Sequence, residues 1–316
     1  MSPSTDRDGG GVIDTSAQDP AGGVSALSLR GVTKRYGDFE LGPLDLELEA
    51  GTVLAFVGPN GAGKTTTLHA IMGLVTRDEG AIEIFGRAND PQAVDWKRDV
   101  GFVGEARGFY RSWTVEKNLA FLARFHRDWK SSEVHALARR LDLNLKKPVR
   151  ALSEGGRSKL SMVAALAHRP RLLLLDEPTK ALDPVVRAEV LDLLWERLED
   201  GETSILYSTH VLSDISRLAD EIAFMREGRL VERKAKDLLT DVWRRVSFRF
   251  SGELPEIVGA RSLRSSGGDH QLVTSNFEAT GEALRSLGAR NVQESRMTID
   301  EIAVEILKEK HRAGAH

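Results

Sequence analysis

A glycine-rich octapeptide near residue 60 lies between an apolar run and a stretch of helical character. It consists of Gly58, Pro59, Asn60, Gly61, Ala62, Gly63, Lys64 and Thr65, which matches the full G-x-x-x-x-G-K-[ST] pattern. Glycines let consecutive backbone N–H groups point at phosphate oxygens, and a helix that starts there adds the positive end of its dipole. Lys64 would supply a mobile positive charge to the β- and γ-phosphates, and the Thr65 hydroxyl could ligate Mg²⁺. The octapeptide therefore predicts a loop that holds a nucleoside triphosphate with its magnesium ion.

Two carboxylates follow directly after a second apolar run. Leu172–Leu175 reads as a buried strand, and Asp176 and Glu177 come where it ends. Asp176 would belong to the Mg²⁺ shell, and Glu177 would polarise the attacking water. The alternative is an acidic pair that only caps the next helix. The phosphate-loop pattern in the same chain favours the catalytic interpretation.

Apolar runs of strand length recur along the first 240 residues. Thr52–Val57 is uniformly apolar or small, as expected of a strand buried on both faces, and residues 44–48 alternate like a half-exposed strand. Further strands are predicted at Val100–Val103 and Ser204–Tyr207, each followed by a polar loop and a helical pattern. A short polar turn near residue 227 predicts a hairpin. This order predicts an α/β fold with a mixed sheet core and ligands at the strand ends.

The composition divides the chain into parts. Residues 1–24 are rich in Gly, Ser and Asp and lack the apolar centre of a signal peptide, which predicts a disordered tail. Residues 25–240 are expected to form the sheet domain, and a helical subdomain of about residues 106–152 is inserted into it, because residues 114–150 contain no strand candidate. Residues 241–316 predict a small C-terminal α+β domain.

The C-terminal pattern is that of a β-α-β-β-α-β unit of ferredoxin-like type with a terminal helix. A turn is expected at Gly267–Gly268, and Thr298 with Glu301 forms a capping-box pattern at the start of the last helix. The predicted elements are strands at Val246–Phe250, on either side of the turn and at Asn291–Ser295, and helices at Pro255–Ala260, Glu282–Leu287 and Thr298–Lys310.

Composition excludes several classes of protein. The formal net charge is −3 and no long Lys/Arg block occurs, so a nucleic-acid partner is not expected. Cysteine is absent, which excludes disulfides, zinc ribbons and cysteine-ligated iron–sulfur clusters. No stretch approaches the roughly 18–20 apolar residues of a membrane span. Any membrane role must therefore come through another subunit.

Four motifs then follow one another in an order that resembles the ATP-binding-cassette (ABC) ATPases. They are the phosphate loop, Leu152-Ser153-Glu154-Gly155-Gly156, Leu175-Asp176-Glu177-Pro178-Thr179 and Ser208-Thr209-His210, and the resemblance covers about residues 26–235. It implies a P-loop NTPase of the ABC cassette type, an Mg²⁺-dependent ATPase that binds ATP and works with a second protomer.

The resemblance also implies roles for single residues. Tyr36 matches the aromatic that stacks on adenine, although an ordinary turn tyrosine is the alternative. Ser153 and Gly155 match the signature motif, which contacts the γ-phosphate held by the other protomer. Asp183 matches a dimer-contact loop, and it also has the position of a helix N-cap before a proline. His210 matches the switch histidine at the γ-phosphate. Thr66, directly after the phosphate loop, is counted with the nucleotide-binding residues.

Three places depart from the usual pattern of the family. Glu105 stands where Gln is expected, and we assign it to the Mg²⁺ site because both side chains offer an sp² oxygen at the same length. Glu154 and Gly156 replace the usual first Gly and the Gln of the signature. Lys180 stands where a small residue is common. None of these changes removes a phosphate ligand or the base.

Three classes of cassette remain open: a transporter subunit, a soluble ABC ATPase, and a nucleotide-binding module without turnover. The stretch between Lys64 and Asp176 has no sustained heptads, and Glu177 with His210 argues for turnover, so the transporter subunit is favoured. Such a subunit would be cytoplasmic and held to the membrane by an integral membrane subunit. The segment Met297–Ile302 is similar to the tail of bacterial ABC-2-type exporter ATPases. Export is therefore favoured over import.

Overall fold

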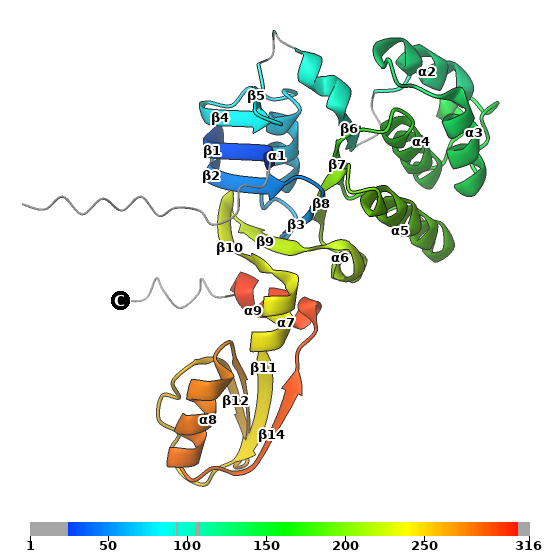
Figure 1. Cartoon of the computed structure of the whole chain (residues 1–316). Helices are drawn as coiled ribbons and strands as arrows, with labels where there is room; N and C mark the ends of the chain where they lie inside the picture. The colour runs from blue at the N-terminus through cyan, green and yellow to red at the C-terminus, as the bar shows by residue number, and fades with distance from the viewer. Residues whose placement is uncertain (1–24, 91, 93, 105–107, 309–316) are drawn as a thin grey trace, which may run out of the picture.

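The computed structural model describes residues 25–90, 92, 94–104 and 108–308. The predicted disordered tail, residues 1–24, lies outside the described residues. Figure 1 shows a cassette of sheets and helices from which a smaller sheet unit extends at the C-terminal end. Among the described residues, no helix combines the length and the apolar character that a membrane crossing requires.

A six-stranded sheet forms the centre of the cassette, with strand order β10-β9-β3-β8-β7-β6. Neighbouring strands are parallel except for β9 and β10, which form the predicted hairpin, so the sheet is mixed. All five residues of β3 are buried, in agreement with the apolar run. Parallel strands place their carboxyl ends at one edge, where the candidate site lies. The strands are β3 (Val53–Val57), β6 (Val100–Val103), β7 (Leu172–Asp176), β8 (Ser204–Thr209), β9 (Glu221–Arg226) and β10 (Arg229–Ala235).

An antiparallel sheet of order β2-β1-β4-β5 packs beside it. Leu44, Leu46 and Leu48 on β2 are buried while the acidic residues between them are exposed, as the alternation predicts. The helix α1 (Lys64–Ile71) follows the phosphate loop, and the 3₁₀ helix η1 (Val94–Asp99) buries Trp96. The strands are β1 (Ser25–Tyr36), β2 (Phe39–Glu49), β4 (Glu79–Ile84) and β5 (Arg87–Ala88).

Residues 114–151 contain helices separated by turns, apart from one isolated bridge between Thr114 and Pro148. Together with α4 they lie to one side of the sheets in Figure 1. The elements are α2 (Val115–Leu122), η2 (Ala123–Phe125), α3 (Ser131–Arg140), η3 (Val149–Ala151) and α4 (Glu154–Leu166). After β7 and β8, α5 (Pro184–Glu199) and α6 (Leu212–Leu218) complete the cassette.

The C-terminal sheet has the order β12-β13-β11-β14, with every neighbouring pair antiparallel. That order is the one a β-α-β-β-α-β unit needs, but the helix predicted over Pro255–Ala260 is wrong. Of those residues only Val258 and Gly259 form a turn, Ala260 begins β12, and Gly252 and Gly259 have left-handed φ values of 133° and 82°. A segment this short cannot offset the cost of helix nucleation. The elements are β11 (Arg244–Arg249), β12 (Ala260–Ser266), β13 (Asp269–Thr274), α8 (Phe277–Ser286) and β14 (Arg290–Arg296).

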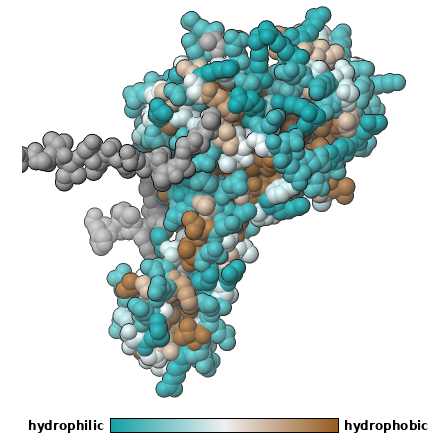
Figure 2. Space-filling view, viewed as in Figure 1, coloured by the Kyte–Doolittle hydropathy of each residue, from teal (hydrophilic) through white to brown (hydrophobic). Residues whose placement is uncertain are grey.

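The chain enters this unit through α7 (Lys236–Val242) and returns from it through α9 (Ile299–Lys308). The buried side chains of α9 join the main core of the cassette with those of α6 and β9. Arg226 on β9 also donates to the Leu307 carbonyl, at 2.8 Å. Figure 2 shows apolar patches at the surface of the C-terminal unit and at its junction with the cassette. The last helix therefore belongs by packing to the cassette.

Candidate nucleotide site

The phosphate loop connects the end of β3 with the start of α1. Gly61 and Gly63 have φ values of 79° and 106°, a region that only glycine adopts readily. A Cβ on Gly58 would lie 2.2 Å from the Met225 carbonyl oxygen, so the loop passes too close to β9 for a side chain there. These glycines explain why the chain can turn its backbone N–H groups inward.

Lys64 points back into its own loop. Its ammonium donates to the carbonyl oxygens of Gly58 and Pro59, at 2.6 Å and 3.2 Å, and the residue is 6% exposed. Burial lowers the pKa of Lys64, and the negative charges of Glu177 and Asp176 oppose that shift. A bound phosphate would add negative charge beside this ammonium and favour its charged form.

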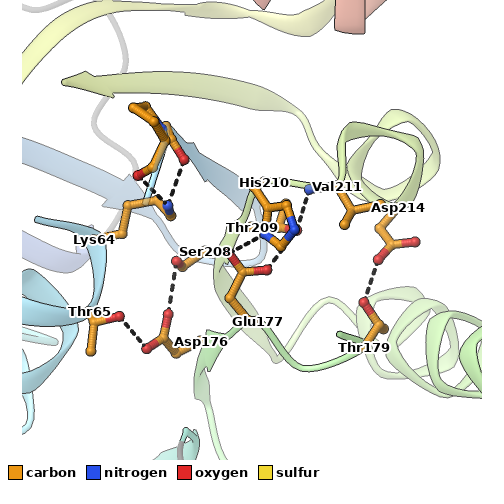
Figure 3. Close-up of polar contacts among 12 residues, drawn as sticks. Lys64, Thr65, Asp176, Glu177, Thr179, Ser208, Thr209, His210, Val211 and Asp214 are labelled. Carbon is orange, nitrogen blue, oxygen red and sulfur yellow. Dashed lines mark hydrogen bonds and ion pairs between the residues drawn. The ribbon is translucent and has the colours of Figure 1, made fainter. Parts of the chain in front are cut away.

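Asp176 joins two neighbouring strand ends to the phosphate loop (Figure 3). Its Oδ2 accepts a hydrogen bond from the Thr65 hydroxyl at 2.7 Å, and its Oδ1 accepts one from the Ser208 hydroxyl at 3.0 Å. Ser208 is paired with Asp176 in the register of β7 and β8. Hydroxyl and carboxylate oxygens side by side are donors that suit a hard divalent cation.

Glu177 is held from two sides. It is one of the few non-glycine residues with positive φ, at 49°, and its N–H donates to the Ser208 carbonyl at 3.0 Å. Its Oε1 lies 2.7 Å from His210 Nδ1, and the Thr209 hydroxyl donates to its Oε2 at 3.4 Å. A strained backbone at such a position is typical of functional sites. The two residues assigned to catalysis, Glu177 and His210, thus lie in contact.

A hollow of about 710 Å³, which we name the phosphate hollow, opens at these strand ends. Glu154 and Lys180, two of the departures from the family pattern, also face it. Its lining includes the phosphate-loop residues from Asn60 to Thr66, together with Phe39, Gly104, Asp176 and Glu177. Of the sequence-predicted binding residues, Thr66 is therefore part of the hollow.

Ser153 and Gly155 line a different hollow, of about 550 Å³, together with Asp183. Ser153 caps α4 by accepting from the Gly156 N–H at 3.1 Å, and a Cβ on Gly155 would lie 2.6 Å from the Ala181 carbonyl oxygen. Asp183 caps α5 by accepting from the N–H groups of Val186 and Val185, which lower the pKa of its carboxyl. Ser153, Gly155 and Asp183 are therefore not among the described residues that line the phosphate hollow, whereas Glu154 lines both hollows.

Two further assignments have different outcomes. Tyr36 ends β1, is 44% exposed and does not appear among the described residues that line the phosphate hollow, whereas Phe39 does. The assignment of Tyr36 to adenine stacking stays a prediction, and sequence reasoning gave no role to Phe39. Glu105 lies outside the described residues, so its place in an Mg²⁺ site stays a prediction. Sequence reasoning also gave no role to Ser208, whose adjacency to His210 was the available signal.

Residues 41–180 match the ABC transporter family. A daunorubicin resistance ATP-binding protein of Streptomyces coeruleorubidus is 32% identical and is aligned over 91% of this chain and 98% of its own length. A bacitracin transport ATP-binding protein of Bacillus licheniformis is 34% identical over 64% of this chain and 67% of its own length. A Nod factor export ATP-binding protein of Burkholderia lata is 34% identical over 69% of this chain and 73% of its own length.

Solved structures agree. The ATP-binding subunit of an ABC transporter, 26% identical, superposes with a TM-score of 0.63 over 68% of this chain and 92% of that one. A dimeric bacterial ABC transporter cassette, 25% identical, superposes with a TM-score of 0.60 over 66% of this chain and 98% of that one. This chain is an ABC ATPase. It belongs to the ATP-binding proteins of ABC transporters, and its relatives include exporter-type members.

Proposed function

We propose that this chain hydrolyses Mg-ATP as one half of a two-protomer unit and powers a separate membrane subunit in export. One observation carries the proposal: the phosphate loop, Asp176, Glu177 and His210 converge at the carboxyl ends of three neighbouring parallel strands. ATP binding and hydrolysis follow from the family. The coupling, the direction of transport and the residue roles are the proposed part.

The residues at these strand ends divide the chemistry between them. The phosphate-loop N–H groups and Lys64 would bind the β- and γ-phosphates, while Thr65 and Asp176 would hold the magnesium ion. When bound, Mg²⁺ would neutralise charge that develops on the phosphate oxygens. Glu177 would accept the proton of the attacking water, and the contact with His210 Nδ1 would keep its carboxylate in place. His210 would also reach toward the γ-phosphate.

A second protomer is needed because the signature residues face another hollow. Ser153, Gly155 and Asp183 line the second hollow and not the phosphate hollow, and the two hollows adjoin at Glu154 and Ala181. A two-fold axis that brings the signature of each chain to the phosphate loop of its partner would create two equal sites. The dimeric cassette among the similar structures supports this arrangement.

A membrane subunit has a candidate docking place in a hollow of about 950 Å³, which we name the apolar groove. It lies between the sheet core and the helical subdomain, and it would hold the chain at the cytoplasmic face of the membrane. Its apolar lining includes Leu74, Val94, Phe102, Phe109, Leu122 and Phe125. Leu74, Val94 and Phe125 are more than half exposed, which is unusual for apolar side chains that have no partner.

Export is favoured by the names of relatives that transport bacitracin, resist daunorubicin and export Nod factor. The resistance protein also aligns with the C-terminal part of this chain, because 98% of its length is covered. Import stays the second candidate, since a sulfate/thiosulfate import ATP-binding protein of Bordetella parapertussis is 33% identical over 74% of this chain.

Three measurements test the proposal. Specific ATPase activity should rise with protein concentration and saturate, and full activity per chain in a demonstrably monomeric sample would contradict the two-protomer unit. A photo-crosslinking amino acid at Phe125 should capture a polytopic membrane protein in the native host, whereas the same group at the exposed Trp195 of α5 should not. For direction, a host without the chain should become sensitive to toxic compounds; a nutrient requirement instead would favour import.

A further inference from the structure

A buried carboxylate lies one helical turn beyond the candidate site. Asp214 is on α6, which begins two residues after His210, and it is 1% exposed. Its Oδ2 accepts from the Thr179 hydroxyl at 2.6 Å and from the Tyr207 hydroxyl at 3.2 Å (Figure 3). Its Oδ1 accepts from Arg187 Nε at 2.5 Å. Four different segments of the chain therefore meet at one carboxylate.

The charge of this group is compensated locally. The Arg187 guanidinium pairs with Asp214 and also donates to the Ser213 hydroxyl at 2.7 Å, so its planar end is held at two points. Burial raises the pKa of the Tyr207 phenol, and the Asp214 charge raises it further, so Tyr207 stays a hydrogen-bond donor. Buried ion pairs of this kind hold geometry tightly, because removal of one partner leaves a buried charge without compensation.

Asp214 anchors both ends of the segment that carries the catalytic carboxylate. Thr179 lies two residues after Glu177, and Arg187 lies four residues after Asp183, to whose carbonyl it donates its own N–H at 2.9 Å. Between these anchors, Leu182 N–H donates to the Thr179 carbonyl at 3.0 Å. The segment from 177 to 183 is thus tied to α6 before and after its turn.

We propose that Asp214 is a positioning residue: through Thr179 and Arg187 it holds the segment of Glu177 and Asp183 in register with the His210 segment. Asp214 does not touch the nucleotide. Asp214 links the segment of His210 with Glu177 and with the loop of Asp183, so that a movement of one of them would shift the others. This inference rests on the proposed roles of Glu177, His210 and Asp183.

The test uses the full chain and steady-state ATPase kinetics of three variants. Thr179→Val keeps the shape of the side chain and removes the hydroxyl, while Thr179→Ser keeps the hydroxyl. Asp214→Asn keeps the shape of the acceptor and removes its charge. We expect Thr179→Val and Asp214→Asn to lower kcat by about tenfold, equivalent to about 1.4 kcal/mol. The KM for ATP should change by less than about threefold, since neither variant alters the phosphate loop. Thr179→Ser should recover most of the loss seen with Val.

A matched control exists on the same pair of helices. Asp192 on α5 and Arg217 on α6 form an exposed ion pair at 3.7 Å, and Asp192→Asn should leave kcat and KM unchanged. The loss in the double variant Thr179→Val/Asp214→Asn should be smaller than the sum of the two single losses, because both changes disturb the Thr179–Asp214 hydrogen bond.

The outcomes separate this inference from the proposed function. A folded Asp214→Asn or Thr179→Val protein with unchanged kcat would overturn the positioning role. If kcat and the fraction of folded protein fall by the same factor, that result would also overturn the positioning role and favour a purely structural network. If Asp214→Asn does not fold, Thr179→Val and its Ser partner decide alone. Near-normal turnover by Glu177→Gln would instead remove the base assignment on which the inference depends.

Discussion

The phosphate hollow and the apolar groove both reach Gly104 at the end of β6, yet they are built in opposite ways. The phosphate hollow gathers charged and hydroxyl side chains from the end of β7 and from the first turns of α1 and α4. The apolar groove gathers exposed aliphatic and aromatic side chains from η1, η2 and the helical subdomain. Among the described residues the two hollows share only Gly104, so we expect chemistry and docking to use separate surfaces that adjoin at this residue.

The substitution Glu177→Gln is expected to have the largest effect, and it alters the phosphate hollow alone. We expect ATP binding to persist and turnover to fall at least roughly 100-fold, the usual scale for loss of a general base. ATP should then keep two protomers together, which size-exclusion chromatography with and without ATP would detect. Crosslinking from the apolar groove should be unaffected. Hydrolysis at a near-normal rate would show that Glu177 is not the base.

The double change Tyr110→Ala with Trp113→Ala addresses the docking side. These rings stack at 4.3 Å and continue through Phe121 to Phe125, which lines the apolar groove. Tyr110 is 50% exposed, so the cluster is a surface feature rather than core filler. We expect basal ATPase activity to persist and its stimulation by the membrane subunit to disappear.

The control for that variant is Trp195→Ala, an aromatic on α5 that is exposed to a similar degree, at 49%. It should leave both the basal and the stimulated rates unchanged. Unfolding of the Tyr110 and Trp113 variant, measured by circular dichroism, would contradict the interface interpretation and favour a structural role for the rings.

In the sequence, Glu105 directly follows Gly104, the residue that lines both hollows. Its extra charge should favour Mg²⁺ and repel the γ-phosphate, so Glu105→Gln should change turnover by no more than about tenfold, or roughly 1.4 kcal/mol. Glu105→Ala removes the oxygen and should raise the Mg²⁺ requirement more than Gln does. Magnesium titrations of ATPase activity compare the three proteins. An Ala variant that matches the wild type would make Glu105 a surface charge.

The smallest effect concerns two histidines at the apolar groove. His126 and His168 stack at 3.9 Å, and burial lowers both pKa values, that of His168 to about 3, with the neighbouring His126 adding to the shift. In the unfolded chain a histidine takes up a proton near pH 6.5. The free energy of unfolding is therefore not reduced by these histidines above that pH, and it falls as the pH is lowered toward 3. For His168 alone, the loss of folding stability between pH 7.5 and 6 should be below about 1 kcal/mol.

His168→Leu should reduce this acid sensitivity, since the apolar side chain has no proton to take up. Chemical denaturation of both proteins at several pH values measures the difference. Equal pH dependence in wild type and variant would show that the stack does not set the acid response.

Sequence reasoning worked best where the functional residues are contiguous in the chain. The phosphate loop and the acidic pair after β7 could be found because each motif contains its own strand end, and the structure has both at one edge of the sheet. The network of Asp214 could not be found this way, since Thr179, Arg187 and Tyr207 come from separate elements and only tertiary packing brings them together.

One expectation failed for a different physical reason, and one stays a prediction. The helix expected over Pro255–Ala260 had an acceptable local pattern, but a short connection between two glycines with left-handed φ does not sustain a helix. The adenine-stacking role of Tyr36 stays a prediction, and motif position alone did not indicate that Phe39, across the β1–β2 turn, lines the phosphate hollow.

The return of α9 to the cassette has a mechanical consequence. A domain attached by one linker can swing in any direction, but the C-terminal sheet is attached through both α7 and α9. It can therefore only hinge about the line that joins these two attachments. Because α9 packs on α6, a rotation of α6 during the ATP cycle would move α9. The C-terminal sheet would then rotate relative to the cassette.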